Sequence, residues 1–429
     1  MQAPYWMLLA CVPVLARAQD VGNFERERGR IMLSQVRKEI EHSYYDSTLR
    51  GVDLAGRAAA LDARIQQATS IAEILASVAQ LALEVNDSHT FFVPPQQTVR
   101  VNYGWEMFMV GESCYVARVE PKSDAARQAV AAGDLVLTVN GHAPTRENLW
   151  KLMYLYHVLR PQGVLHVALQ SPTGQGRELD LAADVRESKR ILDLTGQNDE
   201  DIARVIRESQ NAERDMRALF VEQGDVFVWK LPTFMVDEGM IRDGMKRAHD
   251  HRALILDLRG NSGGAERALL ALVGRLSRDD VAIGTLHQRR RATPLAAKGT
   301  GAEAFTGQLV LLVDSRSASA SEVLARVVQL TGRGTVVGDR TAGAVMRGRY
   351  HPLSIGTQTA VFYGISVTDA DLVMGDAGRL EGVGVRPDSV ILPTGADLAA
   401  DRDPALAHAF GLVGRALDPA AAGALLRRP

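Results

Sequence analysis

The stretch Ala253–Gly264, ALILDLRGNSGG, is the most informative segment of this 429-residue chain. Its first half is an apolar run without alternation, which is typical of a strand buried on both faces of a parallel sheet. Its second half is a turn with paired glycines at Gly263 and Gly264, whose backbone N–H groups are free to bind a ligand. The segment therefore predicts an α/β fold with a binding turn at the carboxyl end of a strand.

A second stretch, Ser317–Glu322 (SASASE), follows the apolar run Leu309–Val313 and opens a helical pattern. Ser319 is therefore expected at a strand-to-helix turn, where its hydroxyl meets the positive end of the helix dipole. A serine followed three residues later by glutamate is also a capping box, so Ser319 alone has a purely structural interpretation. Because both stretches end successive strands of one sheet, we favour catalysis, with the N–H groups of Gly263 and Ala320 holding an oxyanion.

These motifs resemble those of the C-terminal-processing and tricorn-type serine peptidases. The matching features are the DLRGN turn with its paired glycines, the SASE nucleophile turn, and a third turn, VGDRTAG, at 337–343. The resemblance implies an α/β protease core of the crotonase-like (ClpP-like) class. It also implies that Ser319 is the nucleophile and that Gly263 and Ala320 supply the oxyanion hole.

The chain departs from the C-terminal-processing branch at Ala344, where that branch carries the lysine that activates its serine. Tricorn-type members instead use a histidine in a SerHis step after a short helix, and the stretch NDSHTFF at 86–92 matches this pattern. A serine needs a base to become a nucleophile near neutral pH. The resemblance therefore implies that His89 replaces the missing lysine.

The resemblance further implies an acceptor that holds the histidine in one tautomer. The family draws a glutamate from just before a turn near the end of the chain, and Glu381 in LEGVGVRPD at 380–388 fits that position. The resemblance also suggests that Ser88 bridges His89 and Glu381. Each of these residues has a structural alternative, as a packed histidine, an exposed loop carboxylate and a turn residue.

Composition agrees with an exported enzyme of two or three domains, since 46% hydrophobic residues supply an ample core. The 49 basic and 51 acidic residues include no long run of one sign, which argues against nucleic-acid binding. The densest basic cluster, Arg289–Arg291, is either a solvated loop or a site for a substrate carboxylate. The sequence shows no metal-ligand spacing and no phosphate-binding loop with its lysine, so no metal and no cofactor is predicted.

Residues 1–18 are predicted to be a signal peptide, because an apolar stretch precedes ARA at 16–18, a small-residue cleavage pattern. A lipoprotein anchor at Cys11 and a retained anchor are the less favoured alternatives. No later segment approaches the ~20 apolar residues of a membrane span. We therefore expect a periplasmic or secreted protein without an integral span in its mature chain, in which Cys114 is the remaining cysteine and a buried apolar residue.

Hydrophobic patterning divides the rest of the chain. Residues 19–95 are predicted to be a helical domain that delivers His89 to the core. Residues 99–185 resemble a PDZ domain, with a candidate carboxylate-binding loop at Tyr103, Gly104 and Trp105, a short helix at 123–132 and a second helix near 147–158. A PDZ domain binds a peptide tail as an added strand, and the alternative is a β-rich spacer with a closed groove.

The remaining segments are a linker helix at 186–223, a peptidase core at 224–410 and a C-terminal tail at 411–429. Core strands are expected near 226–231, 253–258, 309–313, 335–337 and 360–367. The predicted function is an exported serine endopeptidase that cleaves polypeptides through an acyl-enzyme. The alternative is a non-catalytic relative that keeps the fold to bind peptides or apolar ligands.

Overall fold

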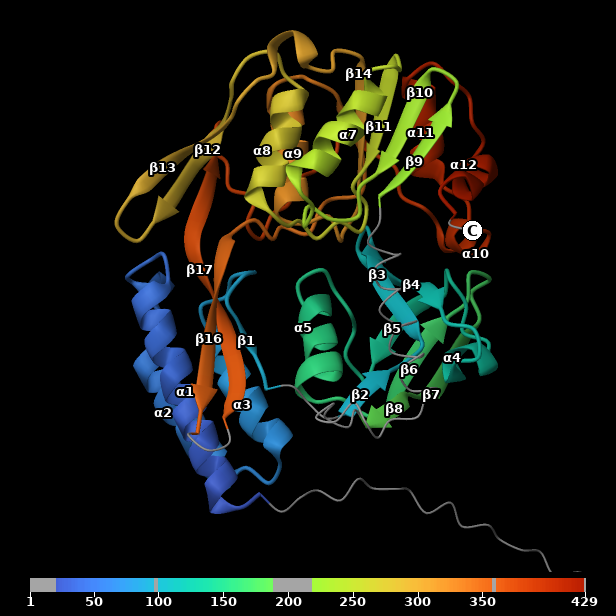
Figure 1. The fold of residues 1–429 in the computed structure, drawn as a ribbon. Helices are drawn as coiled ribbons and strands as arrows, with labels where there is room; N and C mark the ends of the chain where they lie inside the picture. Colours follow the sequence, from blue (N-terminus) through green and yellow to red (C-terminus); the bar gives the residue numbers. More distant parts are fainter. Residues whose placement is uncertain (1–20, 96–98, 188–217, 357–359, 428–429) are drawn as a thin grey trace, which may run out of the picture.

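The computed structural model of the chain describes residues 21–95, 99–187, 218–356 and 360–427. A six-stranded sheet in the order β18-β15-β14-β11-β10-β9, called the central sheet below because helices cover both its faces, lies in the upper half of the view in Figure 1. All neighbouring pairs in this sheet are parallel, apart from β9 and β10. The strands are β9 (Leu219–Gln223), β10 (Val226–Lys230), β11 (Ala253–Asp257), β14 (Gln308–Val313), β15 (Thr335–Gly338) and β18 (Ser389–Val390).

Helices cover both faces of this central sheet. Leu254 and Leu256 pack toward one helical layer, whereas Ile255 points to the other face and meets the last helices of the chain. Because β11 and β14 are covered on both sides, their apolar runs need no alternation. The first layer consists of α7 (Glu238–Ala248), α8 (Glu266–Arg275) and α9 (Ala320–Leu330), and the second of α11 (Pro404–Leu412) and α12 (Pro419–Leu425), with α10 (Gly395–Ala399) before them.

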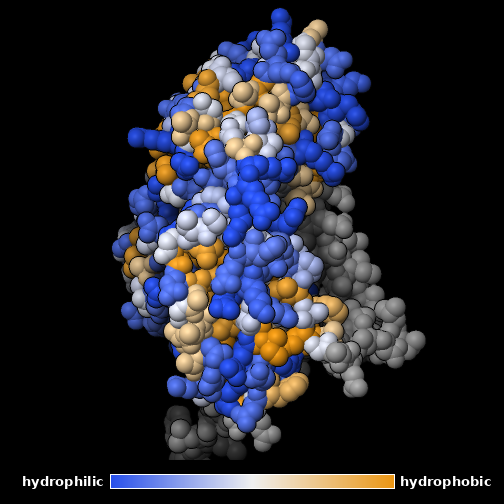
Figure 2. All heavy atoms as spheres, turned by 90° about the vertical axis from the view of Figure 1, so that its left-hand side faces the viewer, coloured by the Kyte–Doolittle hydropathy of each residue, from blue (hydrophilic) through white to orange (hydrophobic). Residues whose placement is uncertain are grey.

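The N-terminal helices pack on a second sheet, in which β17 (Val361–Met374) is the central strand. Met32, Val36 and Ile40 are buried there, whereas Ile31, which the helical pattern placed on the same face, is exposed. Figure 2 shows that the side carrying α1 and α2 is mainly hydrophilic with apolar patches. The elements are α1 (Asn23–Ser43), a 3₁₀ turn (Leu49–Gly51), α2 (Leu54–Gln67), α3 (Ile71–Leu83), β1 (Phe91–Val93), β12 (Val281–Gln288), β13 (Ala292–Ala297) and β16 (Arg347–Ile355).

Arg289, from the predicted basic cluster, donates to the carbonyl oxygens of Glu41 and Tyr44 at the end of α1. A cation at this helix end satisfies carbonyl groups and opposes the negative end of the helix dipole. The structure therefore gives Arg289 a structural role in place of the suggested contact with a substrate carboxylate.

A third part of the molecule is an antiparallel five-stranded sheet in the order β3-β4-β5-β6-β7. The helix expected at 123–132 is a single turn, because Ala129 takes a positive φ of 56° that ends it. The elements are β2 (Val99–Asn102), β3 (Trp105–Val110), β4 (Ser113–Val119), α4 (Asp124–Arg127), β5 (Leu135–Val139), α5 (Leu149–Tyr154), a π turn (Leu155–Leu159), β6 (Val164–Gln170), β7 (Gly176–Ala182) and β8 (Asp184–Glu187).

Two segments differ from expectation. The described parts of the predicted linker helix at 186–223 contain strands instead, since residues 186–187 belong to β8 and residues 219–223 form β9, while residues 188–217 lie outside the described residues. The predicted tail at 411–429 contains α12, whose Ala422 is fully buried against the central sheet. A 3₁₀ turn (Gly301–Glu303) precedes β14.

The fold is mixed α/β with several sheets and N-terminal helices, as the sequence predicted, while the crotonase-like class and the domain limits stay predictions. Cys114 is buried, as expected. The predicted signal peptide and Cys11 lie outside the described residues. Within the described ranges, the helices are too short or too polar to cross a bilayer.

Candidate active site

Ser319 lies at the junction of β14 and α9 in a strained backbone conformation, with φ 53° and ψ −117°. Such a conformation costs a non-glycine residue about 1–3 kcal/mol, so its surroundings must enforce it. The Ser319 N–H donates to the carbonyl oxygen of Ala344 at 2.8 Å and to Glu322 Oε2 at 3.1 Å. The serine thus occupies the strand-to-helix turn expected from the sequence.

Glu322 is fully buried and fixes this turn to the loop that follows β15. Its Oε1 accepts from the Thr341 hydroxyl at 2.5 Å and the Gly343 N–H at 2.7 Å. Its Oε2 accepts from the N–H groups of Ser319 and Ala344. Burial raises the pKa of Glu322 to about 7, and the four donors oppose that rise because they favour the ionised carboxylate. The residue therefore does more than cap α9.

Gly263 approaches Ser319 so closely that no side chain fits. A Cβ atom built on Gly263 lies 2.6 Å from Ser319 Cβ and 3.1 Å from the Ala320 nitrogen, and its φ is 98°. The Gly263 N–H donates to Asn261 Oδ1 at 2.8 Å, so the expected oxyanion donor already has a partner. Among the described residues, nothing accepts a hydrogen bond from the N–H groups of Ala320 or Gly264.

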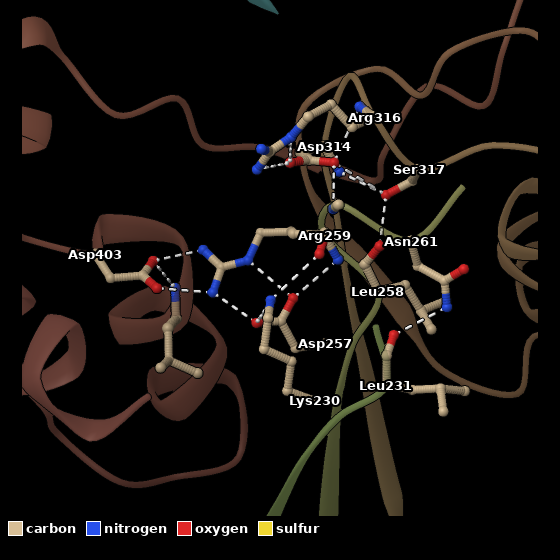
Figure 3. Close-up of polar contacts among 12 residues, drawn as sticks. Lys230, Leu231, Asp257, Leu258, Arg259, Asn261, Asp314, Arg316, Ser317 and Asp403 are labelled. Atoms are coloured by element: carbon tan, nitrogen blue, oxygen red, sulfur yellow. Dashed lines mark hydrogen bonds and ion pairs between the residues drawn. The ribbon is translucent and has the colours of Figure 1, made fainter. Parts of the chain in front are cut away.

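Buried ion pairs hold the base of the glycine turn (Figure 3). Asp257, at the end of β11, lies 2.9 Å from Arg259 and 3.2 Å from Lys230. Burial opposes its ionisation, but these two cations outweigh that effect and hold the pKa of Asp257 well below its usual range. Arg259 also binds Asp403 at 2.7 Å, which ties the turn to α11. Lys230 is thus part of this structural network.

The nucleophile loop and the glycine turn are hydrogen-bonded to each other, as Figure 3 also shows. Asp314 accepts from the Gly260 N–H at 2.9 Å, and the Ser317 hydroxyl donates to the Leu258 carbonyl oxygen at 2.9 Å. The Ala318 N–H donates to the carbonyl oxygen of Asn261 at 3.0 Å. The two motifs are therefore one rigid unit.

The second cluster contains Ser88, His89 and Glu381. The Ser88 hydroxyl lies 2.7 Å from His89 Nδ1 and 2.9 Å from Glu381 Oε2, and the Ser88 N–H donates to Glu381 Oε1 at 2.8 Å. The hydroxyl has one proton, and an ionised carboxylate can only accept. When the Ser88 hydroxyl donates its hydrogen bond to Glu381, its oxygen can only accept a hydrogen bond from His89. Nδ1 of His89 must then carry a proton and act as the donor. Neutral His89 then presents a lone pair on Nε2.

Burial lowers the pKa of His89 below its ordinary value, while the negative charges of Glu381 and Asp87 partly oppose this shift. A lowered pKa keeps the imidazole neutral near neutral pH, as a general base requires.

Asp87 shapes the turn that carries His89, and sequence reasoning missed it. Its Oδ1 accepts from the N–H groups of His89 at 2.9 Å and Thr90 at 2.7 Å, and from the Thr368 hydroxyl at 2.9 Å. The aspartate followed three residues later by threonine is a local turn signal that could have identified it. The contact with Thr368 could not be read from the sequence, because it joins residues from different elements.

The segment 344–346 links the two clusters. The Ala344 carbonyl accepts from Ser319, and the N–H groups of Val345 and Met346 donate to Glu381 Oε2 at 2.9 and 3.3 Å. Within the described part of the chain, no hydrogen bond joins His89 to Ser319 directly. The structure thus brings Ser88, His89 and Glu381 together, and joins them through this segment to Ser319.

The candidate carboxylate-binding loop lies at the start of β3. The side chains of Tyr103 and Trp105 are buried, and Gly104 has a φ of 72° with its N–H bonded to Asn102 Oδ1. Trp105 Nε1 is buried without a hydrogen-bond partner in the described residues. A small cavity beside it is lined by β3 residues and by Leu152 and other residues of α5 and the π turn.

Comparison with known proteins gives consistent matches. Residues 226–391 match the family model described as Peptidase family S41. The chain is 32% identical to the carboxyl-terminal-processing protease of Synechocystis sp. over 137 residues, which cover 32% of this chain and 30% of that protein. It is 24% identical to the tail-specific protease of Haemophilus influenzae over 276 residues, 60% of this chain and 36% of that protein. The matches thus span about a third of these relatives.

Among solved structures, that of mature CPAF has a TM-score of 0.66 at 15% identity. The similarity covers 88% of this chain and 94% of that one. At this identity the likeness concerns the fold alone. It covers more of the chain than residues 226–391, which the family model matches.

Proposed function

We propose that this protein is a serine endopeptidase, on the premise that residues 226–391 belong to peptidase family S41. The observation that carries the proposal is the Ser88 hydroxyl, which bridges His89 Nδ1 and Glu381 Oε2 and so directs the basic nitrogen of His89 away from the carboxylate. A serine in a strained strand-to-helix turn supplies the nucleophile that such a base would serve.

In the first half of the reaction, His89 Nε2 accepts the proton of Ser319 as its Oγ bonds to the carbonyl carbon of the substrate. The carbonyl oxygen becomes an oxyanion, which the free N–H of Ala320 stabilises. The second donor comes from the glycine turn, either Gly263 after it releases Asn261, or Gly264. Collapse of the intermediate breaks the C–N bond, and His89 gives its proton to the leaving amine.

In the second half, water replaces the amine. His89 removes a proton from water, the oxygen attacks the acyl carbon, and the ester bond to Ser319 breaks as the serine regains its proton. The Glu381 carboxylate stabilises the positive charge that His89 carries between these transfers. Ser88 transmits this effect through its hydrogen bonds.

The five-stranded sheet supports a further part of the proposal, that this segment is a PDZ domain which binds peptide tails. β3 is an edge strand of its sheet, as strand addition requires, and the loop at Gly104 precedes it. Export to the periplasm or medium, with cleavage after Ala18, is proposed from the sequence pattern alone.

The test is digestion of an unfolded protein and a diverse peptide pool by the chain from Gln19 onward, read by mass spectrometry. Ser319→Ala and His89→Ala should both abolish cleavage, whereas the exposed controls Ser47→Ala and His142→Ala should cleave at the wild-type rate. Cleavage that survives in His89→Ala refutes the base and spares the nucleophile.

A second candidate function is peptide binding without catalysis. The observation that favours it is the Gly263 N–H, which is engaged by Asn261. A folded wild-type protein that cleaves nothing but binds peptides would establish this second function in place of the first.

A further inference from the structure

The second sheet has one face that the proposed mechanism does not use. Strand register places Tyr350 opposite Ser366, Pro352 opposite Gly364 and Ser354 opposite Phe362. β1 adds Phe91 opposite Ser366 and Val93 opposite Gly364. Directly opposite residues in a sheet share a face. Phe91, Val93, Tyr350, Pro352 and Phe362 therefore form one apolar strip, called the outer strip below.

The other face of the same strands is covered, so the sheet has one packed and one open side. Phe92, Tyr363 and Ile365 are buried in the core of the N-terminal helices. On the outer strip, by contrast, Tyr350 is 55% exposed and Phe362 is 73% exposed. Among the described residues, four phenylalanine, tyrosine or tryptophan residues are exposed, and two of these belong to the strip. Exposed apolar clusters of this kind mark binding surfaces.

The ring of Tyr350 lies on the surface of the strip, where the neighbouring strand has a glycine beneath it. A Cβ atom on Gly364 lies 2.5 Å from ring atoms of Tyr350, so the ring lies across the glycine of the neighbouring strand. The alternate positions of β16 on this face are Gly348, Tyr350, Pro352 and Ser354, and none is charged. The surface therefore suits uncharged, apolar side chains, since a charge placed there would lose hydration without a partner.

The strip begins at the candidate base. A Cβ atom built on Gly348 lies 3.1 Å from His89 Cβ, and Phe91 follows His89 by two residues. From Gly348 to Ser354 the strand runs about 20 Å, a length that an extended peptide of similar residue count matches. The strip is thus continuous with the site where a scissile bond would lie.

We infer that the outer strip binds one arm of the polypeptide substrate, an extended, uncharged segment rich in apolar or aromatic residues next to the scissile bond. This inference rests on the proposed function, and it names the substrate class as unfolded chains whose apolar segments are accessible. The strip supplies contact area for alternate side chains, and Tyr350 and Phe362 are the specificity-determining residues. Their apolar surface leaves water when the segment binds.

Binding to the Ser319→Ala variant tests the inference without requiring catalysis. The probe is a fluorescein-labelled peptide of alternating leucine and serine, amidated at its C-terminus so that the loop at Gly104 has no carboxylate to bind. Tyr350→Ser and Phe362→Ser, each in this background, should weaken binding about tenfold. The matched control is Phe24→Ser, since Phe24 on α1 is also 73% exposed, and it should bind as before.

The active enzyme gives the second readout. The two strip variants should raise KM for apolar peptides and leave kcat near wild type, because uniform binding energy is lost. The same peptide with asparagine in place of leucine should bind weakly to every variant.

Equal binding by Phe362→Ser, Tyr350→Ser and Phe24→Ser overturns the inference. So does a change from dimer to monomer in the strip variants with unchanged peptide binding, because the strip is then a contact between copies of the chain. Strip-dependent binding by a protein that never cleaves refutes the proposed function and leaves the binding inference standing.

Discussion

The Ser88 hydroxyl can donate one hydrogen bond, and the acceptor of that bond decides which nitrogen of His89 is basic. Ser88→Ala removes the bridge to Glu381, so the imidazole loses both its tautomer preference and its orientation. We expect kcat/KM to fall about a hundredfold or more, by analogy with triads whose histidine partner is altered. The fold should persist, so the midpoint temperature of thermal unfolding should match that of the exposed control Ser47→Ala. Unchanged kcat/KM would remove Ser88 from the mechanism.

The pH profile reports on His89. Its lowered pKa keeps it neutral, so kcat/KM should rise with pH through a midpoint below 6.5 and then level off. Glu381 raises the pKa of His89 through its charge, so Glu381→Gln should shift the midpoint to lower pH as well as reduce the rate.

Glu322, whose pKa burial raises to about 7, should add a second rising step to this profile, because the ionised carboxylate accepts the N–H groups that hold Ser319 in place, so the plateau is reached only above this step. Only the His89 midpoint should respond to Glu381→Gln, which separates the two groups. A midpoint that stays in place in Glu381→Gln would show that another group is titrating.

At the scale of elements, the glycine turn depends on close approach to Ser319. Gly263→Ala introduces a Cβ atom 2.6 Å from Ser319 Cβ at a φ of 98°. We expect loss of nearly all activity and about 1–3 kcal/mol of stability. Gly332→Ala is the control for backbone strain alone, because Gly332 has a φ of 62° and open space around it. This variant should lose stability, about 1 kcal/mol, and keep its kcat.

Glu322 joins the start of α9 to the loop at 341–344. In Glu322→Gln, the side-chain NH₂ group must face backbone N–H donors that the carboxylate accepted, so at least one buried donor loses its partner. We expect a loss of about 3 kcal/mol in the free energy of unfolding and a fall in kcat, because Ser319 is no longer held. Urea denaturation and steady-state kinetics measure the two effects. Wild-type values for both would show that the hydrogen bonds are dispensable.

The sequence predicted best those elements whose residues are uniform in burial. Strands β11 and β14 were placed to within a residue, because continuous apolar runs identify strands covered on both faces. Strand β16 was missed, since its exposed and half-buried residues, with Pro352 among them, give no clear pattern. Helix α12 was taken for a tail because it is short and alanine-rich.

For the candidate site, the sequence predicted the functional residues but not the hydrogen bonds that hold them in place. Motifs and the family resemblance named Ser319, His89, Glu381 and Ser88, and the structure brings the last three into contact. Asn261 was not foreseen as the partner of the Gly263 N–H, because a side-chain hydrogen bond within a turn leaves no mark on residue spacing. Glu322 was seen only as a cap, since its bonds to 341–344 cross between elements.

At the scale of the whole molecule, Arg146 is a largely buried cation that helps to fasten the five-stranded sheet to the core, together with the hydrogen bonds from the Gly111 N–H to Asp339 and from the Ser315 hydroxyl to the Met109 carbonyl oxygen. Arg146 lies 2.5 Å from Asp339, and it donates to the carbonyl oxygens of Gly111 at 2.7 Å and Arg340 at 2.9 Å. Arg146→Ala leaves Asp339 buried without that partner, so we expect a loss of about 3 kcal/mol in the free energy of unfolding.

Chemical denaturation of three variants checks this expectation. Arg127→Ala breaks an exposed pair in the same sheet domain and should cost less than about 1 kcal/mol. Asp339→Asn added to Arg146→Ala should recover part of the loss, because the unpaired charge is gone. Equal effects of Arg146→Ala and Arg127→Ala would show that the ion pair between Arg146 and Asp339 contributes no more to stability than an exposed ion pair does.

The hydrogen bonds between Ser88 and Glu381 span 293 positions of the chain. A polypeptide still emerging from the ribosome therefore has Ser319 and His89 before it has the carboxylate that orients the base. Full activity would then wait until synthesis has passed Glu381. Self-digestion of the growing chain would be avoided for as long as this carboxylate is missing.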